Sequence, residues 1–193
     1  FTQGMVGTRV ELTGQWEPEL AYWVPDRELD GVDGSLLLTA FREESTGALL
    51  PVVRGWVQER DQAALELPSG PVTIMGFLDG SESAETGVQP DDEEIESVSA
   101  GALVNAWGGP IYSGYLILVT ADPATGAPGS ATPSGTEIGA MPPPAAPMGG
   151  LNLRNLAYAA EWFVFGGFAL LLWWRMVRDE VRVLRGRPGD GGD

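Results

Sequence analysis

One long apolar stretch near the C-terminus constrains this chain more than any other feature. Residues 156–177 read LAYAAEWFVFGGFALLLWWRMV, and positions 156 to 174 are apolar apart from one acid, Glu161. At about 1.5 Å of rise per residue, a helix over these positions covers about 30 Å, the hydrocarbon thickness of a bilayer. Aromatic residues lie near both ends, as headgroup-level anchors do: Tyr158, Trp162, Trp173 and Trp174. We interpret residues 151–178 as a transmembrane helix, with a buried core helix as the alternative.

The same helix carries the candidate contact residues. Small residues allow two membrane helices to approach closely, so Ala160, Gly166 and Gly167 are expected to pack against a partner helix. An acid within the hydrocarbon region generally faces protein or water, which makes Glu161 a candidate for a polar contact with that partner. Its place close to one end of the stretch also fits an interface residue with no special role.

The distribution of charge predicts the orientation of the chain. Residues 1–150 hold 22 acids and 5 arginines, a net charge of −17, whereas residues 175–193 hold five arginines and four acids. The arginines directly after the apolar stretch place residues 179–193 in the cytoplasm by the positive-inside rule, and residues 1–150 outside. Since the chain starts with Phe1, we expect an export signal or an earlier helix upstream.

Composition excludes several classes of function. The chain has no Cys, no His and no Lys, so nucleophilic triads, thiolate chemistry and zinc sites of Cys or His have no side chains to use. A domain at −17 repels phosphate backbones, which argues against nucleic-acid binding. Haem ligation is left to Met or Tyr, and neither Met176 nor Tyr158 is well placed for it. We expect neither an enzyme nor a resident cofactor or metal.

Residues 1–120 are expected to form a mainly β domain. Short runs of alternating or continuous apolar residues are separated by turn signals such as Asp30-Gly31, Asp79-Gly80 and Gly108-Gly109-Pro110. Six or seven short strands, among them 9–16, 35–41 and 102–107, predict a small antiparallel barrel or sandwich. Residues 121–150 are rich in Pro, Ala, Gly, Ser and Thr, so we expect a linker that buries little apolar surface.

An acidic loop is expected at 81–99. Its run DDEEIE at 91–96 offers several carboxylates, but lacks the alternating ligands and the glycine of an EF-hand loop. We favour a solvated loop, with a Ca²⁺ site or a docking surface for a basic partner as alternatives.

Five motifs, in order along the chain, resemble the Surfeit locus protein 1 family of cytochrome c oxidase biogenesis factors. They are GTRVELTGQW at 7–16, RELDGVDG at 27–34, LPVVRGWV at 50–57, GPVTIMGFL at 70–78 and NLAYAAEWF at 155–163. The residues that carry the resemblance most clearly are Arg27, Arg54, Gly55, Trp56, Tyr158 and Trp162. Two positions differ: the family commonly has His where this chain has Asn155, and Gln where it has Glu161.

The resemblance implies an outward-facing β domain held between two membrane helices and a role in assembly of haem–copper oxidase, often connected with haem a delivery. Within the third motif, Arg54 and Trp56 either project as functional side chains beside flexible Gly55, or Trp56 belongs to the core and Arg54 pairs with an acid.

The residues and the resemblance together predict an accessory or assembly subunit of cytochrome c oxidase. We expect it in the lipid of a bacterial plasma membrane, bound to oxidase subunits or to a respiratory supercomplex by protein–protein contact. The alternatives are a transient haem a delivery chaperone and an unrelated anchored binding module.

Overall fold

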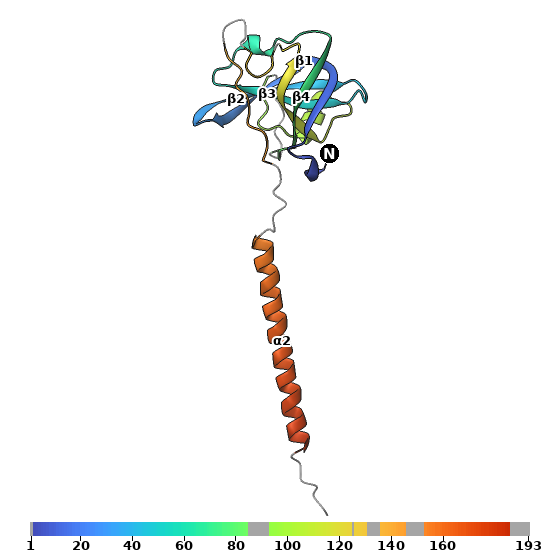
Figure 1. Ribbon diagram of the computed structural model, residues 1–193, viewed down its shortest axis with the longest axis vertical. Coiled ribbons are helices and arrows are strands. Elements are labelled where there is room, and N and C mark those ends of the chain that lie inside the picture. Colours follow the sequence, from blue (N-terminus) through green and yellow to red (C-terminus); the bar gives the residue numbers. More distant parts are fainter. Residues whose placement is uncertain (1, 85–92, 125, 131–135, 146–152, 186–193) are drawn as a thin grey trace, which may run out of the picture. The chain divides into compact units, whose positions relative to one another are not determined.

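The computed structural model of the chain divides into two units, Phe1–Met148 and Gly149–Asp193 (Figure 1). It describes residues 2–84, 93–124, 126–130, 136–145 and 153–185. The first unit is a β-barrel with one short helix, and the second contains the long helix α2 (Leu153–Arg185). A mainly β domain with an apolar C-terminal helix is therefore confirmed.

Five strands close the barrel in the order β1-β2-β3-β5-β4. Their bounds are β1 (Arg9–Leu29), β2 (Val32–Glu43), β3 (Leu49–Val57), β4 (Pro71–Gly80) and β5 (Gly114–Asp122). Neighbours run antiparallel except β3 and β5, which pair in parallel. Closure excludes the sandwich and leaves this part of the chain without the open sheet edges that a sandwich presents.

Strand β1 is long enough to serve two partners. Its first third, Arg9–Gln15, pairs with β4 and most of its length pairs with β2, with register shifts after Glu17 and Val24. Asp30 and Gly31, with φ of 51° and 80°, form the tight turn into β2, which is the backbone geometry that an Asp-Gly hairpin provides. The predicted strand 9–16 thus continues through residues 20–24 to Leu29 as one element, which is one reason for five strands instead of six or seven.

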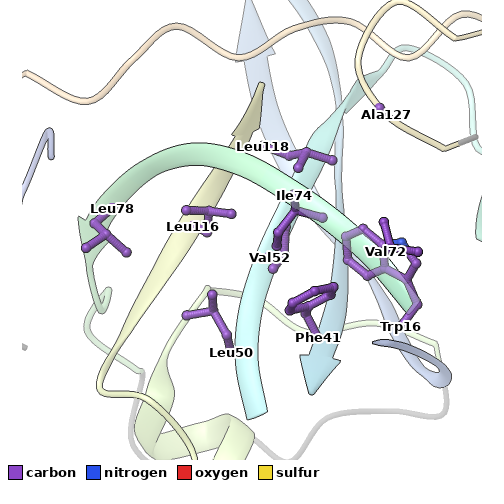
Figure 2. Packing of buried hydrophobic residues seen from close by; sticks show 10 residues of the cluster. All are labelled: Trp16, Phe41, Leu50, Val52, Val72, Ile74, Leu78, Leu116, Leu118 and Ala127. Atoms are coloured by element: carbon purple, nitrogen blue, oxygen red, sulfur yellow. The ribbon is translucent and has the colours of Figure 1, made fainter. Parts of the chain in front are cut away.

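The β2–β3–β5 side of the barrel is buried on both faces. Inside, ring contacts and aliphatic side chains form the core drawn in Figure 2, with Trp16 and Phe41 packed edge to face at 5.1 Å. The outer face, including Leu38 and Ile117, packs under residues 95–107. Burial on both faces explains the continuous apolar run at 35–41.

The segment predicted as a strand at 102–107 is helical. Helix α1 (Ala100–Trp107) ends at Gly108, which has φ of 69° and whose N–H bonds the Val104 carbonyl. Only Leu103 of this helix is fully buried, since one helical face rather than alternate residues meets the barrel. An apolar run this short does not distinguish helix from strand by periodicity, and tertiary packing decides.

Residues 121–150 were expected to form a linker that buries little apolar surface, but the described part of this segment contains buried side chains. Strand β5 continues to Asp122, and Ala127 and Ile138 are buried in the barrel unit. Gly139 exchanges two main-chain hydrogen bonds with Trp56, at 2.9 and 2.7 Å. A segment too poor in apolar residues to fold alone thus still contributes single side chains to a core made by others.

The described end of the acidic loop returns to the barrel. Trp23 exchanges main-chain hydrogen bonds with Glu93 and Ile95, at 2.8 and 3.0 Å, and Ile95 is buried. The carboxylates of 93, 94 and 96 remain exposed, while Asp91 and Asp92 lie outside the described residues. Short 3₁₀ turns at Gln3–Met5 (η1) and Gln62–Leu65 (η2) complete the unit.

Candidate functional site

Arg54 of β3 is fully buried, and it contacts η2 and the segment that follows β5. Its Nε donates to the Gly126 carbonyl at 3.0 Å and its Nη2 to the Ala64 carbonyl at 2.7 Å, while Nη1 has no hydrogen-bond partner among the residues that the structure describes. Burial lowers the pKa of Arg54 to about 9, so the guanidinium is still cationic at neutral pH. Both described contacts go to main-chain oxygens and not to an acid, the partner that one of the two alternatives gave Arg54. The side chain ties β3 to η2 and to the segment after β5.

A glycine is required at position 55 because the segment at residues 138–139 of the same chain approaches it closely. Its φ is 155°, and a Cβ built on it would lie 2.5 Å from Ile138 Cγ2 and 2.6 Å from the Gly139 carbonyl oxygen. Because neither atom is the free end of a flexible side chain, a larger residue would push the 138–139 segment off the strand.

Trp56 is half-buried and binds another motif residue. Its Nε1 donates to the Arg27 carbonyl at 2.9 Å, and its ring borders Gly34 and Gly139. The tryptophan therefore joins the end of β1 to β3. The structure brings Trp56 and Arg27 together, which sequence spacing does not reveal, and it gives Trp56 a packing role rather than a projecting one.

Arg27 holds Glu82 in a bidentate ion pair. Nη1 and Nη2 of Arg27 lie 2.8 and 2.6 Å from the two carboxylate oxygens, and the Val98 N–H donates to Glu82 Oε2 at 2.8 Å. Burial alone would raise the pKa of Glu82, but the hydrogen bonds from Arg27 and Val98 hold it below its ordinary value. The hydrogen bonds that Arg27 donates to Glu82 raise the pKa of the guanidinium. Fork geometry of this kind fixes position as well as charge.

Tyr115 lies beside this pair on β5. Its hydroxyl donates to Asp79 Oδ2 at 3.1 Å, and burial together with the nearby acids raises the pKa of the phenol. The phenol therefore stays protonated and acts as a hydrogen-bond donor. Glu82, Asp79, Ile138 and Gly139 are not among the predicted site residues. The available signal is at Ile138, the one branched aliphatic residue in the Pro- and Gly-rich stretch 121–150.

Helix α2 presents the remaining candidates. Its span Leu156–Arg178 is long and apolar enough to cross a membrane, and every side chain in it is exposed. Phe163 is 83 % exposed and Trp162 is 76 % exposed. A helix with apolar side chains exposed on every face is unfavourable in water, whereas it fits the hydrocarbon region of a membrane. At the C-terminal end of the span, the Arg178 guanidinium lies 5.0 Å from the Trp174 ring, a cation–π contact.

The predicted partner-binding residues of α2 are exposed. Glu161 has no hydrogen bond or ion pair within the described residues, and a Cβ on Gly166 or Gly167 would meet no atom within 4 Å. Tyr158 and Ala160 are exposed as well. These positions are available to a partner or to lipid.

The barrel offers little for catalysis or metal binding in the part of the chain described. No group of three or more Asp or Glu side chains there could hold a metal ion. One barrel end has a mostly apolar cavity of about 220 Å³, lined by residues such as Met5, Leu12, Leu78 and Tyr112. The interactions of the described motif residues are hydrogen bonds, an ion pair and apolar packing.

The fold and these residues define a class: a small closed β-barrel on a chain that also carries a helix fit to anchor it in a membrane. A family model described as SURF1 family matches residues 2–167. The chain therefore belongs to the SURF1 family, as its motifs indicated, and that family is known for cytochrome c oxidase assembly rather than for catalysis. Comparisons with curated proteins and with solved structures gave no match.

Proposed function

We propose that this chain is a membrane-anchored accessory or assembly subunit of cytochrome c oxidase that acts by protein–protein contact. The observation that carries the proposal is the family match, which extends from the barrel into the apolar helix. The barrel supports it because its motif residues Arg54, Gly55 and Trp56 hold segments of one unit together and present no reactive pair. The partners we propose are oxidase subunits, in isolation or within a respiratory supercomplex.

The proposed location is a bacterial plasma membrane with the barrel on the outer side. The arginines that follow the span support this orientation by the positive-inside rule, and the carboxylate-rich barrel suits an aqueous compartment. With His and Cys lacking, a persistent protein contact accounts for the composition more simply than a haem carrier does.

Co-purification in mild detergent tests the proposal. The tagged full chain is purified from cells that make the oxidase, beside an unrelated single-span protein with the same tag and expression level. We expect oxidase subunits to be enriched with the full chain and not with the control, as measured by quantitative mass spectrometry. Equal recovery in both preparations would contradict the proposal and favour an anchored binding module that does not contact the oxidase.

Two further experiments separate haem delivery from protein–protein contact and locate that contact. An absorption spectrum of the purified chain that shows a stoichiometric Soret band would shift the role to haem delivery. A chimera that carries the barrel on an unrelated span of equal length reports whether barrel contacts alone retain the oxidase.

A further inference from the structure

One end of the barrel contains a cavity of about 220 Å³ that the core side chains do not fill, called the end cavity below. Six side chains line it, all but the last without a hydroxyl, amide or charged group: Met5, Val10, Leu12, Leu50, Leu78 and Tyr112. Leu50 and Leu78 belong to the buried core drawn in Figure 2, whereas Met5 is 40 % exposed. The end cavity therefore reaches from the core to solvent.

Two polar groups that border the end cavity already have partners. The Tyr112 hydroxyl lies 3.0 Å from Thr46 Oγ1 and 3.3 Å from Glu43 Oε2. The Leu78 N–H donates to the Thr8 carbonyl at 2.9 Å. A water molecule in a protein interior needs about two to four polar partners, so water is a poor occupant of a cavity lined in this way.

An apolar ligand suits the end cavity in size and in chemistry. Apolar protein cavities of about 150 Å³ stay dry and bind benzene. The end cavity is larger and has an exposed side, so it has room for the end of a hydrocarbon chain whose other end remains in water. Met5 at the exposed side is unbranched and rotates about three bonds, which allows it to move aside for such a chain.

We infer that the end cavity binds the tail of a fatty acyl chain, with the carboxyl or headgroup end in water. A chain with a span fit for a membrane lies where acyl chains reach a higher local concentration than soluble apolar compounds do. The rival occupant is an apolar side chain of a partner protein. It would bring main-chain polar groups to an edge where Tyr112 and Leu78 are already bonded. The inference does not depend on the oxidase as a partner.

Photolabelling of the full chain in nanodiscs tests the inference, since the chains of a detergent would compete for the site. The probe is decanoic acid with a diazirine at the end of its chain. A phospholipid with the same tail shows whether a membrane lipid or a free fatty acid is the source. Adducts are mapped by peptide mass spectrometry, and helix α2 is the internal standard because its exposed span takes up probe from the bilayer without saturation.

We expect the barrel adducts in the peptides that contain Leu12, Leu50 and Leu78. Val104 and Val119, which are 38 % and 37 % exposed, should be labelled less. Excess decanoate should lower the cavity adducts about tenfold relative to those on α2, because a single site saturates. Decanedioate of the same length should not compete, since its second carboxylate would enter the apolar cavity. Equal competition by both acids, or adducts spread evenly over exposed apolar positions, would overturn the inference.

A matched pair of variants places the same ring inside and outside the end cavity. Val10→Phe fills part of the cavity and should lower its adducts about tenfold, whereas Val119→Phe on β5 should leave them unchanged. Near-UV circular dichroism reports whether Val10→Phe folds, and the comparison of the two acids on the wild type decides if it does not. Unchanged adducts in a folded Val10→Phe variant would refute the inference. A wild type without cavity adducts would refute it as well, and would leave the cavity to a partner's side chain.

Discussion

At the scale of single residues, the motif RGW at 54–56 has a structural role in the barrel. The arginine ties three segments together, the glycine admits the 138–139 segment, and the tryptophan bonds the end of β1. Replacing any of the three acts first on the assembly of the barrel, and through it on partner binding.

Gly55→Ala should destabilise the barrel by about 3 kcal/mol or more, because the new Cβ would overlap Ile138 and the Gly139 carbonyl. The matched control is Gly70→Ala, where φ is also positive, at 100°, but a Cβ meets nothing within 4 Å. Its cost is expected at about 1–2 kcal/mol, from backbone strain alone. Urea unfolding of the full chain in detergent, followed by near-UV circular dichroism, measures both; equal losses would show that space at Gly55 is not limiting.

Glu43 makes part of the stability depend on pH. Hydrogen bonds from Thr46 and Ser45 lower the pKa of Glu43 to about 2, from an ordinary 4.5, so the folded state binds fewer protons than the unfolded one between these values. Stability from this group is present above pH 4.5 and is lost as pH falls toward 2. We expect the advantage of the wild type over Glu43→Gln at pH 6 to shrink at pH 3. Urea midpoints at both pH values measure this change.

The neighbouring acid provides the control for that measurement. Glu44→Gln changes an exposed side chain of the same turn and should leave the pH dependence close to that of the wild type. A wild type and a Glu43→Gln variant that fall in parallel from pH 6 to pH 3 would contradict the assignment.

At the scale of elements, the segment that follows β5 belongs to the barrel through a few side chains. Ile138 is 1 % exposed and packs with Trp23, Leu37 and Val57. The average composition of these thirty Pro-, Ala- and Gly-rich positions does not show which single apolar side chain is buried in the barrel. The same limit applies to 102–107, where packing against the outer barrel face selects a helix.

Ile138→Ala should destabilise the barrel by about 2–5 kcal/mol, since it empties a buried position. Val119→Ala on β5, where the side chain is 37 % exposed, should change stability by only about 0.5 kcal/mol. Unfolding in urea with hydrogen exchange of the β3 peptides measures the two losses. A value for Ile138→Ala as small as that of Val119→Ala would mean that 136–141 does not belong to the core in solution.

At the scale of the whole molecule, charge and hydropathy divide the chain into an acidic barrel and an apolar helix followed by arginines. Cysteine labelling tests the proposed orientation. Glu44→Cys in the barrel should react with a membrane-impermeant maleimide on intact spheroplasts, whereas Gly192→Cys in the tail should react only after lysis. The reverse pattern would place the barrel in the cytoplasm and remove its proposed contact with the outer face of an oxidase.

The sequence by itself determined the features that depend on local pattern: the apolar helix, the β class of the first unit, the hairpin at Asp30-Gly31 and the family motifs. Only the tertiary structure decided what depends on contacts between distant positions. Such contacts closed the barrel through a parallel β3–β5 pair, placed Glu82 on Arg27 and Gly126 on Arg54, and buried Ile138. The physical reason is that periodicity and composition report how a residue meets its chain neighbours and water, whereas a buried cation or a glycine at a close approach is fixed by a partner many residues away.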